Sequence, residues 1–523
     1  MTSVLSFTKE SSNHSETLFA PVCSQIAEKL DEAIDSRNLE KVKRLISEAR
    51  SILLNHDESS FGSLFYAVGT ALAYERDELI KKKALEGRET GGKSNGNPFT
   101  CSDVVKIHGD VLWFLRHSEE LICQIEERED TKPYLDETRL VLYVNLGNAL
   151  DFCGRKCSAM EYYSKALAIR PFIMAYANIG KCIDHYAFLE GDSGHKIVLL
   201  KKAYSYYLKT EQSDPENDYQ SVKDRIKERM LFLEKAYGKE LLCSPFDYKE
   251  VKTKTGEEMQ YRSWCLENHL FLNPLNDLLE LNWAFSCDPL HLSFIRADKN
   301  QTNPPFVFEM VNQIKEEYIY SRFMLYESTK HNNGVHYADK DSTIFDILNY
   351  SSYSIRHEKL KTAYRTLFSI FDRISFLLNM YFELGLKEHD VSFDHIWEKL
   401  NQKEEENIAI QALHWINRDF RERFGDADTP HARMIRKLRN ALEHKFVAIH
   451  VFPVENEMAL GADSIYRISE DHMFDYAMEL LKLVREAIIE LTIAIRIEEN
   501  SQIDDSKQIV KISMFEYSDD YKR

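Results

Sequence analysis

The stretch RKLRNALEHKF, residues 436–446, combines an Arg, an Asn and a His with further cations in a segment that has helical periodicity. Arg436, Asn440 and His444 follow one another at intervals of four, so a helix places them in one line. Arg439 lies beside that line, next to Asn440. These residue types at this spacing indicate a site that handles protons and phosphate.

The chemistry of this group is that of metal-independent RNA cleavage. An imidazole can take or give a proton near neutral pH, and a guanidinium can hold a phosphate at two points and stabilise its developing charge. His444 would help the ribose 2′-hydroxyl attack the neighbouring phosphate, or protonate the leaving 5′-oxygen; the sequence leaves both roles open. Arg439 would stabilise the phosphorane-like transition state, and Asn440 would orient the His or donate to the phosphate.

The local charge around this group contrasts with that of the chain. The 523 residues carry a net charge of −18, which disfavours general nucleic-acid binding. Between His431 and Phe446 the sequence has five basic residues and one acidic residue, Arg433 and Arg436 among the basic ones. This basic segment predicts a local field that could hold RNA.

A single amphipathic helix should present these side chains. Thr429 and Pro430 are a typical start, a capping hydroxyl followed by Pro in the first turn. An apolar stripe recurs at spacings of three and four and predicts the buried face, formed by Ile435, Leu438, Leu442 and Phe446.

A second polar line lies on a long apolar helix expected near residues 355–386. Its members share one face and are Arg365, Ser369, Asp372 and Asn379. Asp372 is the candidate support for the site, because a buried carboxylate needs a partner. It would pair with Arg436 or Arg439 and position the basic helix; a local pair with Arg365 or Arg373 is equally open.

The first half of the chain predicts paired helices. Residues 143–171 carry the signature of a tetratricopeptide repeat at Tyr143, Leu146, Gly147, Leu150, Ala159, Tyr163, Ala166 and Pro171. A second unit starts at Tyr176, Ile179 and Gly180 and continues at Ala203 and Tyr207, with an insertion of about 11 residues between its helices. With the earlier FYAVGTALAYE and a divergent pair before it, these units predict a helical repeat domain over residues 15–238 that could hold a peptide or protein partner.

The second half predicts a helical bundle. Residues 239–302 form an expected connector packed on the bundle, residues 303–498 the bundle of long antiparallel helices, and residues 499–523 a polar tail containing the strand-like QIVKISMF. VAIHVFPV and SIYRIS are expected to pair as a small β-hairpin. The predicted fold class is therefore all-α.

The motif Arg439-Asn440-x-x-x-His444, late in a helix of such a bundle, resembles the R-x4-6-H motif of HEPN domains. Together with the repeats and the segment YRSWCLENHLFLNPLNDL, it resembles the LA2681-like HEPN family over residues 250–498. The resemblance implies a ribonuclease, often of a toxin–antitoxin or anti-phage system. It also implies a homodimer in which the two motif helices face each other and form one composite site.

Other motifs are weaker. GRETGGKS, residues 87–94, matches the phosphate-binding loop pattern but follows a charged helical segment instead of a strand, so we expect no nucleotide cofactor. KEHDVSFDH, residues 387–395, offers His and Asp side chains but is expected to be an ordinary loop without metal.

The nine cysteines lack a C-x2-C pair and indicate reduced thiols. No signal peptide or membrane span is recognisable, which predicts a cytoplasmic protein.

These observations predict an endoribonuclease that cuts RNA through Arg439 and His444 without metal, with the repeats as sensor or restraint. The alternative from a different class is a non-catalytic interaction protein, whose bundle dimerises and whose repeats recruit partners.

Overall fold

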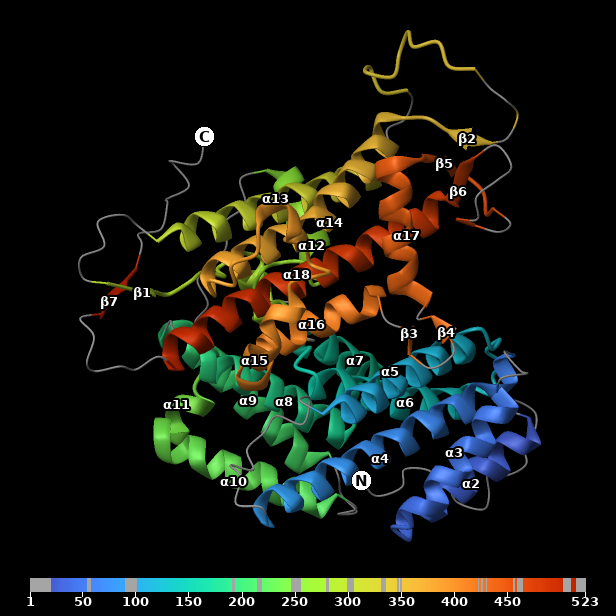
Figure 1. Ribbon diagram of the computed structural model, residues 1–523, viewed down its shortest axis with the longest axis vertical. Helices are drawn as coiled ribbons and strands as arrows, with labels where there is room; N and C mark the ends of the chain where they lie inside the picture. Colours follow the sequence, from blue (N-terminus) through green and yellow to red (C-terminus); the bar gives the residue numbers. More distant parts are fainter. Residues whose placement is uncertain are drawn as a thin grey trace. The chain divides into compact units, whose positions relative to one another are not determined.

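The structure is a computed structural model of the chain. It describes residues 20–53, 58–89, 101–190, 193–213, 219–245, 255–278, 282–298, 305–330, 335–345, 348, 350–421, 423–424, 427–428, 430–454, 457–458, 464–501 and 509–513. The chain is mainly helical, with a few short strands, which confirms the predicted all-α class (Figure 1). It folds into two compact units, Met1–Phe246 with Arg423–Ala427, and Asp247–Glu422 with Asp428–Arg523.

The first unit is a succession of antiparallel helices (Figure 1). The main contacts are between sequence neighbours, α4 with α5, α6 with α7 and α8 with α9, and α5–α6 and α7–α8 contacts join the pairs. The bounds are α2 Pro21–Asp35, α3 Leu39–Leu53, α4 Gly62–Glu89, α5 Ser102–Cys123, α6 Lys132–Phe152, α7 Lys156–Ile169, α8 Ile173–Leu189, α9 Ser193–Gln212, α10 Gln220–Tyr237 and α11 Lys239–Cys243.

Two of these pairs are built alike. A Cβ at Gly147 of α6 would collide with the ring of Tyr163 of α7, and a Cβ at Gly180 of α8 would lie 2.5 Å from Cε1 of Tyr207 of α9. Both rings are fully buried, so the missing side chain on one helix makes room for the large one on the next. The predicted small and large positions of the repeat pattern therefore meet in space.

The surface of these pairs repeats as well. The Lys165 ammonium lies 4.3 Å from the ring centroid of Tyr162, and the Lys209 ammonium lies 4.9 Å from that of Tyr206. Gly147 and Gly180 are 33 residues apart and Tyr163 and Tyr207 are 44 apart, so the second pair contains 11 extra residues. α8 ends at Leu189 and α9 begins at Ser193, so these residues do not form the predicted insertion between the helices, and most of them lengthen the two helices instead.

The phosphate-loop pattern begins inside a helix. α4 continues to Glu89, so the first residues of GRETGGKS are helical and do not follow a strand. The geometry that cradles a phosphate, in which a strand leads through a glycine loop into a helix, is therefore absent before Gly87. The remaining residues of the motif lie outside the described part of the chain.

The second unit is a bundle of long helices with small sheets at its ends (Figure 1). Its core elements are α13 Phe306–Thr329, α14 Ile355–Tyr381, α16 Ile408–Arg421, α17 Pro430–His444 and α18 Glu470–Ser501. The remaining elements of this unit are α12 Gly256–Glu267, α15 Trp397–Glu406, β1 Ile295–Asp298, β2 Ser351–Ser352, β5 Phe446–His450, β6 Ile465–Ser469 and β7 Ile509–Ile512. The short strands β3 Arg423–Phe424 and β4 Ala427–Asp428 pair with each other, and Arg423–Ala427 is grouped with the first unit. The long helix α18 contacts α13, α14, α16 and α17, and its central turns are buried.

The predicted hairpin is wrong in its direction. β5 and β6 pair, but they run parallel, with Phe446 opposite Ile465 and His450 opposite Ser469. A parallel pair needs a connection of about a dozen residues instead of a tight turn, and the residues between β5 and β6 supply that length. β2 adds antiparallel to the other side of β5. At the opposite end of the unit, β7 in the tail pairs antiparallel with β1.

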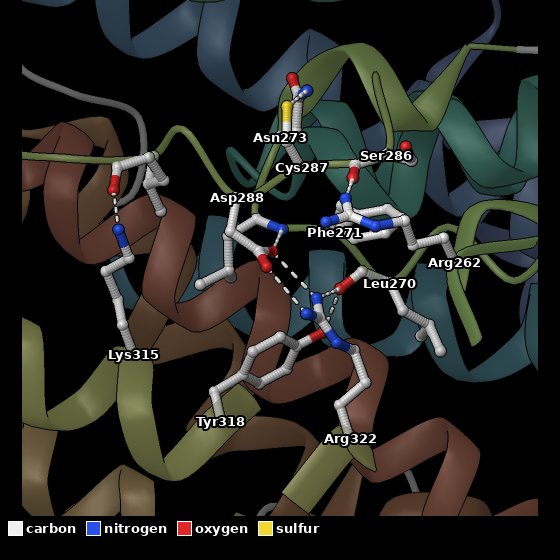
Figure 2. Close-up of polar contacts among 12 residues, drawn as sticks. Arg262, Leu270, Phe271, Asn273, Ser286, Cys287, Asp288, Lys315, Tyr318 and Arg322 are labelled. Carbon is white, nitrogen blue, oxygen red and sulfur yellow. Dashed lines mark hydrogen bonds and ion pairs between the residues drawn. The ribbon is translucent and has the colours of Figure 1, made fainter. Parts of the chain in front are cut away.

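Two buried arginines of the bundle bind the segment that precedes it. Figure 2 shows the Arg322 guanidinium of α13 between the Asp288 carboxylate and the Leu270 carbonyl, with distances of 2.8 Å from Nη2 to Oδ2 and 2.9 Å from Nη1 to the carbonyl oxygen. Arg485 of α18 donates to Asp277 Oδ1 at 2.7 Å and to two backbone carbonyls of the same segment. Residues 270–277 and Asp288 are therefore fixed to α13 and α18 by charge-assisted bonds.

Candidate functional site

Helix α17 carries the predicted site residues. It begins at Pro430 and ends at His444, and the expected cap Thr429 lies outside the described residues. Ile435 and Leu438 are fully buried and Leu442 nearly so, as the apolar stripe predicts. Phe446 is the exception, because the helix ends two residues earlier. As the first residue of β5 it is 76% exposed, so its predicted burial is wrong.

Helix α14 holds both ends of this apolar stripe in place. The buried Tyr364 hydroxyl donates to the Ile435 carbonyl at 2.9 Å. Arg365 donates through Nε and Nη2 to the Leu442 carbonyl at 3.3 and 3.2 Å. The last carbonyls of a helix lack partners inside the helix, and a cation there satisfies one and complements the helix dipole. Arg365 therefore caps the end of α17 that carries His444.

Arg436 faces a loop residue instead of α14. Its Nη2 donates to Asp394 Oδ2 at 2.7 Å, and both side chains are about one-third exposed. The buried Asn417 of α16 donates to Asp394 Oδ1 at 3.2 Å and to the Phe393 carbonyl at 2.8 Å. The sequence hypothesis of a direct pair between Asp372 and Arg436 is therefore wrong, because Asp394 occupies that place.

Asp372 contacts the loop that contains Asp394 and so acts on α17 only indirectly. Its Oδ1 accepts the backbone N–H of Phe393 at 3.3 Å, so it holds the residue that precedes Asp394. It forms no ion pair with Arg365, Arg373 or Arg439, all of which are among the described residues. Burial raises the pKa of Asp372, while the Phe393 N–H and the nearby charge of Arg439 act in the opposite direction.

Arg439 lies between the bundle and the surface. Its Cζ is 5.3 Å from the ring centroid of Phe368 on α14, and its Nη1 donates to Asn440 Oδ1 at 3.0 Å. The ring and the amide fix the plane of the guanidinium while its remaining N–H groups stay available. Asn440 is exposed, so the pair presents its polar edge to solvent.

His444 is the exposed last residue of α17, one turn beyond Asn440. Its ring forms no hydrogen bond or ion pair with any other described residue. Arg433 and Lys445 are exposed on the same helix and its end. The structure thus joins Arg439 to Asn440 directly, places His444 along the same helix, and assigns Arg436 to Asp394.

The sequence analysis missed the residues that hold α17 from outside. Asp394 lies in KEHDVSFDH, which was considered only for metal, and Asn417 and Phe368 carried no motif. Within the described part of the chain, no three His, Cys, Asp or Glu side chains are grouped so that they could hold a metal ion. None of the described helices has both the length and the apolar character needed to cross a membrane.

Comparison with known families concerns the segment that contains this site. Residues 298–498 match the family model LA2681-like HEPN. The resemblance stated from the sequence is confirmed for this segment, which includes α13 to α18 and all the candidate residues. The match leaves out the helical repeats and residues 250–297. No curated protein and no solved structure matches the chain. Because HEPN domains are often ribonucleases, the match favours an RNA-related role.

Proposed function

We propose that the protein is a metal-independent endoribonuclease of the HEPN type. The observation that carries this proposal is the pairing of Arg439 with Asn440 on a helix that ends in an exposed His444, inside the segment that matches the family. Arg439 is held by Phe368 and Asn440, so its guanidinium is preorganised to bind an anion.

The reaction would be a transesterification within the RNA backbone. The ribose 2′-oxygen attacks the adjacent phosphorus, its proton passes to a base, and the bond from phosphorus to the 5′-oxygen breaks. The leaving oxygen takes a proton, and the products are a 2′,3′-cyclic phosphate and a 5′-hydroxyl. His444 supplies one of these two proton transfers, and Arg439 stabilises the extra negative charge on the phosphorus centre.

Both copies of a homodimer would contribute to the reaction. One His supplies one proton transfer, whereas the reaction needs two. A second α17 across an interface would bring a second His444 and a second Arg439 to the same phosphate. Arg433 would contact flanking phosphates, while Arg436 would mainly position α17 through Asp394.

The helical repeats would act as sensor or restraint for a toxin or anti-phage defence effector. Arrays of helix pairs offer extended surfaces to peptides and partner proteins. A partner bound to the first unit would then decide when the second unit is active. Growth of cells that express full-length protein, the repeat-deleted chain or the His444→Ala variant of each tests this role: restraint predicts greater His444-dependent toxicity without the repeats.

The direct test uses purified full-length protein, labelled RNA and EDTA. Wild-type protein should produce fragments with cyclic phosphate ends, and His444→Ala and Arg439→Ala should each abolish them. Cleavage that persists in both variants rejects the site.

An alternative is a non-catalytic interaction protein. Exposed apolar side chains precede β2 in the loop after α13, which is unusual for a surface without a partner; they are Val335, Tyr337, Ile344, Phe345 and Leu348. This surface favours a protein partner, and absence of RNA cleavage together with stable self-association would favour this alternative.

A further inference from the structure

Four exposed aromatic residues flank the short ladder that β5 forms with β2. Phe446 is 76% exposed, Tyr350 72%, Phe452 58% and Tyr353 55%. We call these four residues the aromatic row. Large rings on a sheet normally pack on a neighbour, and an exposed ring forgoes the free energy that burial would supply. Four of them in one short stretch therefore indicate a binding surface.

The register of the strands orders the row from His444 outward. β2 is antiparallel to β5, with Ser351 opposite His450 and Ser352 opposite Ile449. Continued by one residue, the register places Tyr353 opposite Ala448, between Phe446 and the other end of β5. At that end the Tyr350 and Phe452 rings meet edge to face, with centroids 5.7 Å apart. The strand from Phe446 to His450 spans about 13 Å.

The row begins beside the proposed catalytic residue. Phe446 lies two residues after His444, at the point where α17 ends and β5 begins (Figure 1). Between them stands the exposed Lys445, and Lys437 and Arg439 of α17 add positive charge. A ligand that binds Phe446 therefore lies close to His444 and to the cation of Lys445.

We propose that the aromatic row binds unpaired bases of the RNA next to the phosphate that is cut. This inference rests on the proposed function and names its substrate class, single-stranded RNA. Bases stack on aromatic side chains in any order of sequence, while cations contact the backbone. In a duplex the faces of the bases are covered by their neighbours, so a double-stranded segment cannot use the row.

The charge decides between RNA and an apolar protein partner. A protein that covered the rings would also bury Lys445 and approach the basic face of α17, so it would need matching carboxylates. RNA brings a negative charge with each nucleotide and a flat apolar base beside it. The exposed Lys445 between His444 and Phe446, with the cations of α17, suits that pattern, and Glu443 is the one acidic residue between His431 and Phe446.

The test measures binding by the full-length His444→Ala protein, so that RNA stays intact. The probes are a fluorescein-labelled mixed-sequence RNA strand and the same strand annealed to its complement, followed by fluorescence anisotropy. The single strand should bind more tightly than the duplex. Adding Phe446→Leu should weaken single-strand binding about tenfold, whereas Phe446→Trp should preserve it. Leu keeps an apolar side chain but removes the stacking face.

Phe306→Leu is the matched control. Phe306 is an exposed Phe of the same unit, at the first residue of α13, and this helix of 24 residues is about 36 Å long before the loop to β2 begins. Its substitution should leave binding unchanged.

Equal affinity for strand and duplex, or an unchanged affinity of the Phe446→Leu protein, overturns the proposal. So does a change in molecular mass of the Phe446→Leu protein without RNA, which would assign the row to a protein interface. Cleavage that depends on His444 but not on Phe446 would reject stacking and keep the ribonuclease. Binding that depends on Phe446 without any cleavage by wild-type protein would support stacking and reject the ribonuclease.

Discussion

Arg436 of α17 and Asp394, three residues before α15, form the ion pair that connects the candidate catalytic helix to the loop after α14. The distance from Nη2 to Oδ2 is 2.7 Å, and Asn417 fixes the other carboxylate oxygen. Helices α14 and α16 hold the same segment, because Asp372 of α14 accepts the N–H of Phe393 and Asn417 of α16 donates to the Phe393 carbonyl. In the proposed ribonuclease, Arg436 would therefore act through the position of α17, whereas Arg439 would contact the substrate.

Removal of this ion pair should lower activity more than stability. Asp394→Asn should cost about 0.5–1 kcal/mol of unfolding free energy, because both partners are partly exposed. RNA cleavage should fall several-fold, and Asp394→Arg combined with Arg436→Asp should recover part of the loss. Urea unfolding and initial cleavage rates measure both effects. A double variant no better than the singles would show that the pair does not position α17.

The pair of Arg322 and Asp288 should be essential for the second unit. Burial alone would raise the pKa of Asp288, but the charge and hydrogen bonds of Arg322 outweigh it and lower this pKa. Arg322→Ala leaves the carboxylate buried without its partner and should cost about 3–5 kcal/mol of unfolding free energy. Since the folded pKa is lowered, the contribution of Asp288 is present at neutral pH and is lost as the pH falls through that pKa.

Calorimetry of the full-length protein at pH 7 measures the loss on substitution. Because the folded pKa of Asp288 lies below 3.8, a series of pH values below 4 is needed to follow the loss of its contribution in the wild-type protein. Arg262→Ala, which removes a half-buried arginine of the same region, is the control and should cost less. Equal losses of unfolding free energy for the two substitutions would contradict the prediction that the pair of Arg322 and Asp288 is essential for the second unit.

The contact of Gly180 with Tyr207 predicts the sensitivity of the first unit. A Cβ at residue 180 would lie 2.5 Å from Cε1 and 2.7 Å from Cδ1 of Tyr207. The ring cannot turn away, because its hydroxyl donates to Asp184 at 3.0 Å. Gly180→Ala should therefore cost about 1–3 kcal/mol of unfolding free energy. Gly256→Ala is the control, since its Cβ would meet nothing within 4 Å, and thermal unfolding compares the two.

Asp31 of α2 should make the first unit less stable as the pH rises. Burial, with the charges of Asp35 and Glu28, raises the pKa of Asp31 to about 7. The folded state therefore keeps a proton that the unfolded state releases near pH 4, and stability is lost between about pH 4 and pH 7. Asp31→Asn removes this loss, so it should stabilise the protein on the order of 1 kcal/mol at pH 8 and not at pH 4. Melting temperatures at both values measure it, and a gain that is equal at both would contradict the shift.

The sequence predicted what depends on local repetition. Gly147 meets Tyr163 and Gly180 meets Tyr207 because neighbouring helices pack on each other, so the small and large positions of the repeat signature carry the contact. The ion pair of Arg436 with Asp394 joins residues 42 apart through a loop, and no periodicity marks such a pair. The direction of β6 was equally hidden, because alternation of side chains is the same in parallel and antiparallel strands. In the sequence, Phe446 continues the helical spacing of Ile435, Leu438 and Leu442, but α17 ends at His444, before it.

A composite site should be detectable by mixing two inactive proteins. If each site takes Arg439 from one copy and His444 from its partner, Arg439→Ala and His444→Ala are each inactive alone. In a mixed two-fold dimer, one of the two sites then has an intact Arg439 from the His444→Ala chain and an intact His444 from the Arg439→Ala chain. With random exchange, half of the dimers are mixed, so about one quarter of wild-type activity should return.

RNA cleavage in EDTA is measured after the two proteins are mixed, and light scattering with differently tagged chains verifies that they exchange. Each variant mixed with itself is the control and should remain inactive. If the chains exchange and no activity returns, one Arg439 and one His444 from different copies are not sufficient. Either Arg439 and His444 of the same copy act together, or the composite site needs both copies of His444.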